Sequence, residues 1–303
     1  MELRHLRYFA AVARHLNYTQ ASRSLHVAQP AISQTILDLE YELGLKLLAR
    51  TKRSVQLTAA GSAFLPEAIE ILRRADEARR VAERAARGEI GRVEVAFLGP
   101  GAGPFLPRVL RAYRRQYPDV ELRLIEMMPE QQLEALGSGG IDVGFSSPFP
   151  EQTRGWLDSE LIFTDQLVLA LPKEHLLAEH ARVNLRDVAT EDFVQFHRRG
   201  APNLFDACVA ICGRAGFAPR IVNEASIMDT VLTLVESGLG VSLVPGCVRH
   251  LRRQDCVLRT VRPASPRIEI RMIWRRDADS PALIALREVV LAHRHDIRAQ
   301  MQI

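Results

Sequence analysis

A chain of 303 residues with 47% hydrophobic residues is long enough for about two domains with buried cores. No stretch approaches the roughly eighteen consecutive apolar residues of a membrane span, and the opening residues MELRHLRYFA do not resemble a signal peptide. We therefore expect a cytoplasmic protein that does not enter a membrane. Its cysteines are too few and too loosely spaced for a disulfide framework or a C-x-x-C metal site, so no metal and no cofactor is expected. They are Cys208, Cys212, Cys247 and Cys256.

The net charge of +4 originates in the first sixty residues. That segment holds eight Lys and Arg against four Asp and Glu, whereas the two signs balance in residues 61–90 and again in residues 91–303. Basic residues that neutralise phosphates supply the non-specific part of DNA affinity. The charge distribution therefore predicts double-stranded DNA as the partner of the amino-terminal segment.

The segment 17–40 predicts two short amphipathic helices that meet at a sharp turn. Apolar spacing groups Ala21 with Leu25 on the first helix and Ile32 with Ile36 on the second. Pro30 lacks a backbone N–H and is tolerated only in a first turn, so the second helix should begin at about residue 28 or 29. An ordinary helical hairpin with a polar face is the alternative to a DNA-reading pair. Uncharged side chains that could reach base edges in a major groove are Gln29, Ser33 and Gln34.

Further elements complete this amino-terminal domain. A helix beginning near Leu3 would pack behind the pair, and Gly44 would end the second helix. Two extended segments, 46–49 and 54–57, flank a basic tip at residues 50–53. Such a tip indicates a wing that enters a minor groove, where Arg is favoured, although a solvated charged turn is the alternative.

Together these residues resemble the amino-terminal signature of LysR-type transcriptional regulators, most closely the branch that controls aromatic and chloroaromatic degradation. The resemblance implies that Gln29, Pro30, Ser33 and Gln34 face bases, and that the wing residues Arg50, Lys52 and Arg53 contact DNA. Ala28 stands where the family usually has Ser, which removes a hydroxyl N-cap worth about 1 kcal/mol. The matching motifs include Gln29-Pro30-Ala31-Ile32-Ser33, Leu43-Gly44, Leu47-Leu48 and Leu57-Thr58-Ala59-Ala60-Gly61, in a register that is unbroken from Leu3 to about Leu72.

A long helix is predicted over residues 62–87, which contain no Gly and only Pro66 in the first turn. Its narrow apolar stripe with charged flanks favours a partner helix, and the family resemblance implies a dimer linker; packing against its own domain is the alternative. We expect domains at 1–60 (winged helix-turn-helix), 61–90 (linker helix and hinge) and 91–303 (effector domain). The stripe contains Leu65, Ala68, Ile69, Leu72, Ala75, Ala82 and Ala86.

Residues 91–303 alternate predicted strands with predicted helices, which indicates an α/β domain with parallel strands. The whole chain is therefore expected to be α/β, with an all-α winged head. The resemblance implies a two-lobed effector domain of the periplasmic-binding-protein type. We expect the chain to cross between lobes near 159–163 and 261–267. Lobe I would span about 91–161 and 267–303, and lobe II about 162–266.

A small effector would bind between the lobes, outside the carboxyl ends of strands. The Gly- and Pro-rich segment Gly99, Pro100, Gly101 and Ala102 is a candidate anion cradle, and a simple strand-to-helix turn is the alternative. The hydroxyl groups and the arginine usual in the aromatic-degradation branch are missing here, which argues against a muconate-like diacid. Other candidate lining residues are Met128, Ser146, Ser147, Phe196, His197 and Ser226.

No catalytic motif accompanies this domain, so we expect no enzyme activity. Cys208 and Cys212, four residues apart on one helical face, are interpreted as buried small hydrophobes, with a redox pair as the alternative. The prediction is a DNA-binding transcriptional regulator, a dimer of dimers, controlled by a small organic effector such as an organic acid or an aromatic metabolite. The alternatives are a solute-binding or enzymatic α/β domain with an accessory DNA-binding head, and a non-specific architectural DNA binder.

Overall fold

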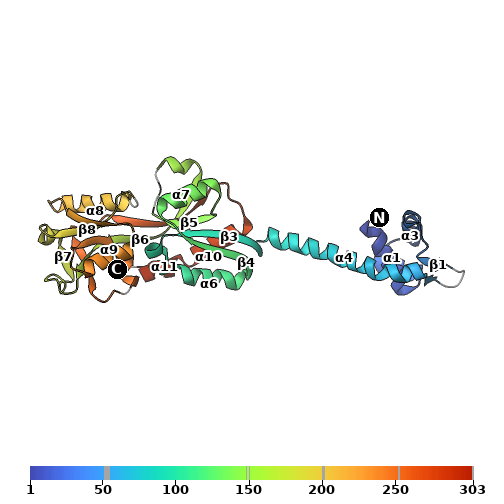
Figure 1. The fold of residues 1–303 in the computed structure, drawn as a ribbon. Coiled ribbons are helices and arrows are strands. Elements are labelled where there is room, and N and C mark those ends of the chain that lie inside the picture. Colours follow the sequence, from blue (N-terminus) through green and yellow to red (C-terminus); the bar gives the residue numbers. More distant parts are fainter. Residues whose placement is uncertain (51–54, 148, 150, 200–201, 252, 302–303) are drawn as a thin grey trace. The chain divides into compact units, whose positions relative to one another are not determined.

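A computed structural model describes residues 1–50, 55–147, 149, 151–199, 202–251 and 253–301 (Figure 1). The predicted basic tip at 51–54, including Lys52 and Arg53, lies outside the described residues, as does the side chain of Arg50. The chain divides into two compact units, Met1–Arg84 and Ala85–Ile303.

The first unit packs three short helices and a small hairpin around the start of a long helix. Phe9, Ile32, Ile36 and Leu39 are completely buried, so the apolar faces predicted from spacing do form its core. The predicted helix-turn-helix is confirmed as the pair α2 and α3. The elements are α1 (Leu3–His15), α2 (Tyr18–Leu25), α3 (Gln29–Leu43), β1 (Leu48–Arg50), β2 (Val55–Leu57) and α4 (Ala59–Ala86).

The turn between α2 and α3 is set by local hydrogen bonds. Helix α2 begins where the Asn17 side chain accepts a hydrogen bond from the Gln20 amide at 3.0 Å. It ends at His26, whose φ of 53° lies in the left-handed region. Ala28 then returns to an extended conformation, and α3 starts at the next residue. The reversal takes so few residues that α3 is held firmly against α2.

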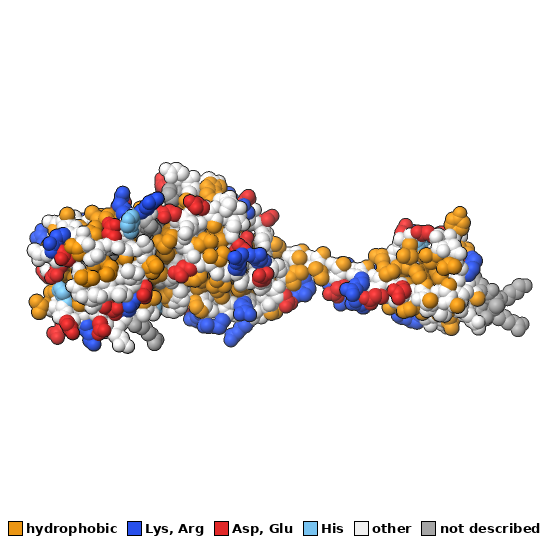
Figure 2. Space-filling view, viewed as in Figure 1, with side chains coloured by type: hydrophobic (Ala, Val, Ile, Leu, Met, Phe, Trp, Pro, Cys, Tyr) orange, Lys and Arg blue, Asp and Glu red, His pale blue; other side chains and the backbone are white. Residues whose placement is uncertain are grey.

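Helix α4 is covered over only part of its length. Among its described residues Gly61 and Ala68 are buried, whereas Ile69, Ile71 and Val81 have exposed fractions of 48%, 38% and 44%. Figure 2 shows acidic and basic side chains next to one another along this helix. Salt bridges between them include Arg73–Glu70, Arg74–Glu70 and Arg79–Glu83.

The second unit is built on a sheet that runs through two lobes. Its strand order is β4-β3-β5-β12-β6-β11-β7, with β10 also pairing with β6, while β8 and β9 pair separately. β3 is parallel to both β4 and β5, as the alternation of strands and helices predicted. One core cluster fills the first lobe around Phe105, Tyr113 and Phe145, and others fill the second lobe around Phe193 and Val231.

The helices and strands of the second unit are as follows. In the first lobe they are β3 (Ile90–Phe97), α5 (Gly99–Ala102), α6 (Leu106–Gln116), β4 (Asp119–Glu126), α7 (Pro129–Ser138), β5 (Val143–Ser146), η1 (Glu151–Gly155), β12 (Arg267–Arg275), α10 (Pro281–Ala292) and α11 (Arg294–Met301). In the second lobe they are β7 (Arg182–Asn184), η2 (Leu185–Val188), β8 (Asp192–Phe196), α8 (Pro202–Arg214), β9 (Arg220–Ala225), α9 (Met228–Glu236), β10 (Ser242–Pro245), η3 (Gly246–Leu251) and β11 (Cys256–Arg262).

The first crossing between the lobes lies inside one unbroken strand, β6 (Leu157–Pro172). β6 pairs with β12 as far as Gln166 and with β10 and β11 from Leu167 onward. The residues 159–163, where the crossing is expected, belong to the part of β6 that pairs with β12. The register shifts there, because Leu161 pairs with Arg271 and Phe163 with Ile270, so that Ile162 is passed over. The lobe boundary at 161/162 stays a prediction.

Gly61 lies where the start of α4 touches the hairpin. The hydroxyl of Thr58 accepts a hydrogen bond from the Gly61 amide at 2.9 Å and donates to the Lys46 carbonyl at 2.6 Å. A Cβ at position 61 would collide with the backbone carbonyl of Leu47. Only glycine fits this approach without displacing the hairpin.

We expect Gly61→Ala to destabilise the first unit by about 1–3 kcal/mol, because the added methyl meets rigid backbone. Amide hydrogen exchange of residues 1–84 in the whole protein measures this loss. Gly213→Ala is the matched control, since a Cβ there meets open space. Equal protection of residues 1–84 in both variants would contradict the close-approach explanation.

Candidate DNA-binding and effector sites

Helix α3 presents the polar surface that the sequence predicted. Gln29, Pro30 and Gln34 are exposed, and Ser33 is half-buried at the edge of the same surface. The opposite side of the helix lies in the core of the unit. The arrangement suits a helix that is held from behind while its uncharged side chains meet base edges.

The start of α3 has no side-chain cap. Ala28 provides no oxygen for the first amides, as expected for an alanine in this position. Its backbone carbonyl instead accepts hydrogen bonds from the Ala31 amide at 3.0 Å and the Ile32 amide at 3.3 Å. Pro30 in the first turn has no amide to satisfy. Backbone bonds and proline together therefore define the beginning of the recognition helix.

Gln34 is held in one orientation on the surface of α3. Its Nε2 donates a hydrogen bond to Oδ1 of Asp38, one turn later, at 2.8 Å. This bond orders a long side chain before any DNA is bound, which lowers the entropic cost of using it for recognition.

Glu40 fixes the wing to α3 and was not predicted to do so. Its side chain is 1% exposed, and Oε1 accepts hydrogen bonds from the amides of Leu47 at 2.8 Å and Leu48 at 3.0 Å. Lys46 Nζ lies 3.0 Å from the other carboxylate oxygen. The sequence carried a signal for this role, because a residue four positions after the buried Ile36 lies on the same helical face.

Two opposing effects act on the pKa of Glu40. Burial alone would raise it, but the hydrogen bonds from Leu48, Lys46 and Leu47 outweigh burial and lower the pKa below the ordinary value of 4.5. The carboxylate is therefore bound as an anion, and its contribution to folding depends on its charge.

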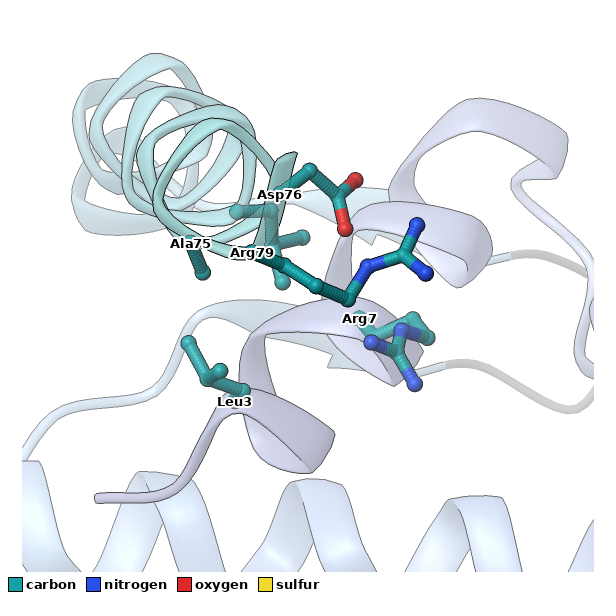
Figure 3. Close-up of a pocket in the computed structure, with 6 residues that line it drawn as sticks. Leu3, Arg7, Ala75, Asp76 and Arg79 are labelled. Atoms are coloured by element: carbon teal, nitrogen blue, oxygen red, sulfur yellow. The ribbon is translucent and has the colours of Figure 1, made fainter. Parts of the chain in front are cut away.

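A hollow of about 490 Å³ lies between α1 and α4 in the first unit. Figure 3 shows that Leu3 and Arg7 of α1 border it from one side and Ala75, Asp76 and Arg79 of α4 from the other. The apolar stripe predicted on α4 thus divides: Leu65 and Ala68 pack in the core of the first unit, whereas Ala75 borders the hollow. Leu72 lies at the transition and takes part in both. Its lining residues are Leu3, Arg7, Leu72, Ala75, Asp76 and Arg79.

In the second unit, the first-lobe candidates follow the carboxyl ends of neighbouring parallel strands. The Leu98 amide donates to the Phe145 carbonyl at 3.1 Å, and the Met127 amide donates to the Phe97 carbonyl at 3.1 Å. These bonds keep the ends of β3, β4 and β5 side by side. The residues gathered at this edge are Gly99, Pro100, Gly101, Ala102, Met128 and Ser146.

The predicted anion cradle is one turn of helix, α5. The amides of Ala102 and Gly103 donate within the segment, to the carbonyls of Leu98 at 2.9 Å and Gly99 at 2.7 Å. The carboxylate of Glu126 lies directly against Gly99. Few free amides and a neighbouring negative charge both disfavour an anionic ligand at this turn.

Among the first-lobe candidates, Ser146 has a side-chain hydroxyl without a hydrogen-bond partner in the described residues. The residue is 0% exposed, and its Oγ has no hydrogen-bond partner among the described residues. A buried hydroxyl without a partner carries a free-energy cost of about 1–3 kcal/mol. A ligand that hydrogen-bonds this hydroxyl would remove that cost.

The second-lobe candidates lie at the ends of β8 and β9. Phe196 is 6% exposed and packs into the second-lobe core, so its ring serves the fold. The His197 amide donates to the Ala225 carbonyl at 2.9 Å, which places His197 beside the exposed Ser226. Nδ1 of His197 accepts a hydrogen bond from the Arg199 amide at 3.1 Å, and Nε2 lies 3.6 Å from the Glu224 carboxylate.

A contact between α5 and η3 joins the two lobes at this edge. Cys247 of η3 is buried in the first-lobe core, and its amide donates to Oδ2 of Asp165 at 2.8 Å. Asp165 is itself 4% exposed and lies next to the crossing in β6. The crossing and the edge where an effector would bind are therefore linked directly.

The predicted burial of Cys208 and Cys212 is confirmed. Both lie in the second-lobe core, and burial raises the pKa of Cys208 to about 12 and that of Cys212 to about 11. Such thiols remain protonated and unreactive at neutral pH.

Within the described residues no cluster of His, Cys, Asp or Glu could hold a metal ion. In that same part of the chain no helix is long and apolar enough to cross a membrane.

A helix-turn-helix unit joined to a two-lobed α/β unit defines a DNA-binding protein with a sensor domain. Residues 3–62 match the bacterial regulatory helix-turn-helix proteins of the lysR family, and residues 86–294 match the LysR substrate binding domain. The chain belongs to the LysR family: it is a DNA-binding transcriptional regulator with a substrate-binding domain.

Similar proteins extend over nearly the whole chain. The transcriptional regulator AlsR of Bacillus subtilis is 37% identical and aligns over 93% of each chain. ClcR of Pseudomonas putida is 32% identical over 93% of this chain and 96% of its own. The crystal structure of full-length CbnR complexed with its target DNA matches with a TM-score of 0.80, 32% identity, and coverage of 97% and 100%.

Glu40→Gln should destabilise the first unit by about 1–3 kcal/mol at neutral pH, because charged hydrogen bonds to two amides and Lys46 are weakened. The wild-type pKa is lower in the folded state, so the stabilisation is present above pH 4.5 and is lost as pH falls through the folded pKa. The variant should lack this loss. Unfolding of residues 1–84, followed by hydrogen exchange between pH 3 and 7, tests both points.

The exposed Glu67→Gln is the control for this measurement and should leave the profile unchanged. A variant profile that still falls with the wild-type profile below pH 4.5 would show that another group is responsible.

Proposed function

We propose that this regulator reads its operator through the exposed face of α3, with Gln29, Pro30, Ser33 and Gln34 at base edges. The observation that carries the proposal is this uncharged face, supported from behind by a buried core, in the segment that holds the net positive charge of the chain. Arg50, Lys52 and Arg53 of the wing would contact phosphates or a minor groove.

The protein would act as a dimer of dimers. The hollow between α1 and α4 suits a second copy of α4, because its apolar members Leu3, Leu72 and Ala75 would be covered while the paired charges stay in water. Two recognition helices would then meet half-sites about one helical turn, or a multiple of it, apart. On this proposal residues 1–60 bind DNA, 61–90 link the copies and 91–303 sense the effector.

A small organic effector would bind between the lobes at the edge formed by α5, β5, β8 and η3. The unpartnered hydroxyl of Ser146 supports a ligand with a hydrogen-bonding group, and Glu126 beside Gly99 favours a neutral or only partly charged ligand there. His197 and Ser226 would contact it from the second lobe, with Met128 at the rim. Binding would shift the population of lobe arrangements by the difference in affinity between them.

The proposed place of action is the cytoplasm, where operator DNA is accessible. We propose no catalytic role, since the matched relatives are named transcriptional regulators.

Footprinting on the DNA upstream of its own gene tests the DNA-reading proposal. We expect Gln29→Ala to lose the preference for operator over random duplex, because a base contact is worth about 1–3 kcal/mol. Arg53→Ala should weaken binding to both duplexes alike and lower the dependence on salt, since a phosphate contact releases counterions.

The wild type should protect some tens of base pairs, as two half-sites require. Equal, sequence-independent losses from both variants would show that α3 does not read bases. A flat footprint at moderate salt would contradict operator binding altogether.

Ser146→Ala tests the effector edge. Removing an unpartnered buried hydroxyl should leave stability unchanged or slightly higher, whereas affinity for an effector found by a thermal-shift screen should fall about tenfold. Ser242→Ala is the matched control, because Ser242 is also 0% exposed and its hydroxyl also has no partner among the described residues. Ser242 is the first residue of β10, whereas the proposed effector edge lies at the other end of this strand, where η3 follows. Equal affinity losses in the two variants would remove Ser146 from the site.

A further inference from the structure

A second hollow lies in the sensor unit, beside the segments that cross between the lobes. It measures about 280 Å³ and is bordered by residues of β6, β7, β11 and the connection from β11 to β12. No candidate effector residue takes part in it. Its lining residues are Gln166, Leu167, Arg182, Thr260, Val261, Arg262, Ala264 and Ser265.

Strand register brings two arginines to one side of this hollow. β7 and β11 are parallel, with Arg182 paired to Thr260 and Val183 paired to Val261. Val183 and Val261 are buried in the second-lobe core, so Arg182, Thr260 and Arg262 project from the opposite face. Two guanidinium groups and a hydroxyl therefore share one concave surface.

The charge of this surface is not neutralised within the described residues. Neither Arg182 nor Arg262 has an ion pair or a side-chain hydrogen bond there, and no carboxylate lines the hollow. Three other arginines of the same lobe are engaged. Arg198 pairs with Asp206, Arg220 with Asp192, and Arg259 donates to the Ala178 carbonyl. Asp165, next to the hollow, is occupied by the amides of Gln166 and Cys247.

We propose that this hollow is a second ligand site, for a small dianion whose charges are carried by carboxylate or phosphate oxygens. Arg182 and Arg262 would each offer a planar fork of donors that matches such oxygens, and the Gln166 amide group would add a further donor. The volume of about 280 Å³ suits an anion of a few carbon atoms.

The site would also bear on the movement between the lobes. The Leu167 amide donates to Ser265 Oγ at 2.7 Å, so the two crossing segments are hydrogen-bonded to each other at the floor of the hollow. An anion held between them and the second-lobe arginines would stiffen this junction. A ligand here would therefore alter the response to an effector bound at the other edge.

Equilibrium dialysis of the full-length protein with radiolabelled succinate, and separately with radiolabelled inorganic phosphate, tests the proposal at constant ionic strength. We expect one of the two anions to bind and neutral succinamide not to compete. Succinate alone would assign the carboxylate class, and phosphate alone the phosphate class. The double variant Arg182→Gln, Arg262→Gln should weaken binding at least about tenfold, which corresponds to about 1.4 kcal/mol.

Arg214→Gln is the matched control, because Arg214 is an exposed arginine of the same lobe outside the hollow. Its affinity should equal that of the wild type, and the double variant should retain the wild-type thermal unfolding and operator footprint. Equal losses in the double variant and the control would show non-specific attraction and overturn the site. Unchanged affinity in the double variant, a loss confined to Ser146→Ala, or binding of neither anion would overturn it as well.

Discussion

The sensor unit depends on one strand that belongs to both lobes. β6 runs for sixteen residues without a break, and its two halves pair with different partners. The partners change at Gln166 and Leu167, so one continuous backbone ladder leads from the first lobe into the second. On the proposed function, a shift between lobe arrangements would have to bend this strand where its partners change, which is a hinge movement.

Two buried carboxylates hold the functional parts of the chain in place. Asp165 accepts hydrogen bonds from the Gln166 and Cys247 amides, which attaches the crossing to η3. Glu40 accepts from the amides at the start of the wing, which attaches β1 to α3. A buried charge is tolerated only when donors surround it, and backbone amides are donors with fixed positions. Each carboxylate therefore fixes a distance between elements that apolar packing alone would leave adjustable.

The spacing of apolar residues was sufficient to predict an element and its buried face where only one face of that element is buried. The cores of α2 and α3, the long helix α4 and the alternating strands of the first lobe follow directly from the spacing of apolar residues. It says less inside the sheet, where β5 and much of β6 are buried over consecutive residues and show no alternation. Which strands pair with one another, and where β6 changes partners, depends on contacts between distant parts of the chain and could not be read from spacing.

The same contrast applies to the candidate site residues. The exposure of Gln29 and Gln34 could be predicted, because the buried face of their helix is clear from the spacing of its apolar residues. The burial of Phe196 in the second-lobe core could not be read from its place near the end of a strand, because it depends on residues of other elements that pack against it. Glu40 was overlooked because a charged residue at a core position is normally a surface residue. Its helical phase, four residues after Ile36, would have identified it.

The pairing of Gln34 with Asp38 orients this side chain without using up its donors. Nε2 carries two hydrogens, and the bond to Asp38 engages one of them. The second N–H and the Oε1 acceptor stay available. Together they are the donor and acceptor that a bidentate contact to adenine needs in a major groove. On the proposed mode of DNA reading, Asp38 would therefore hold the Gln34 amide in position for such a contact, and the bond between the two side chains could persist when DNA binds.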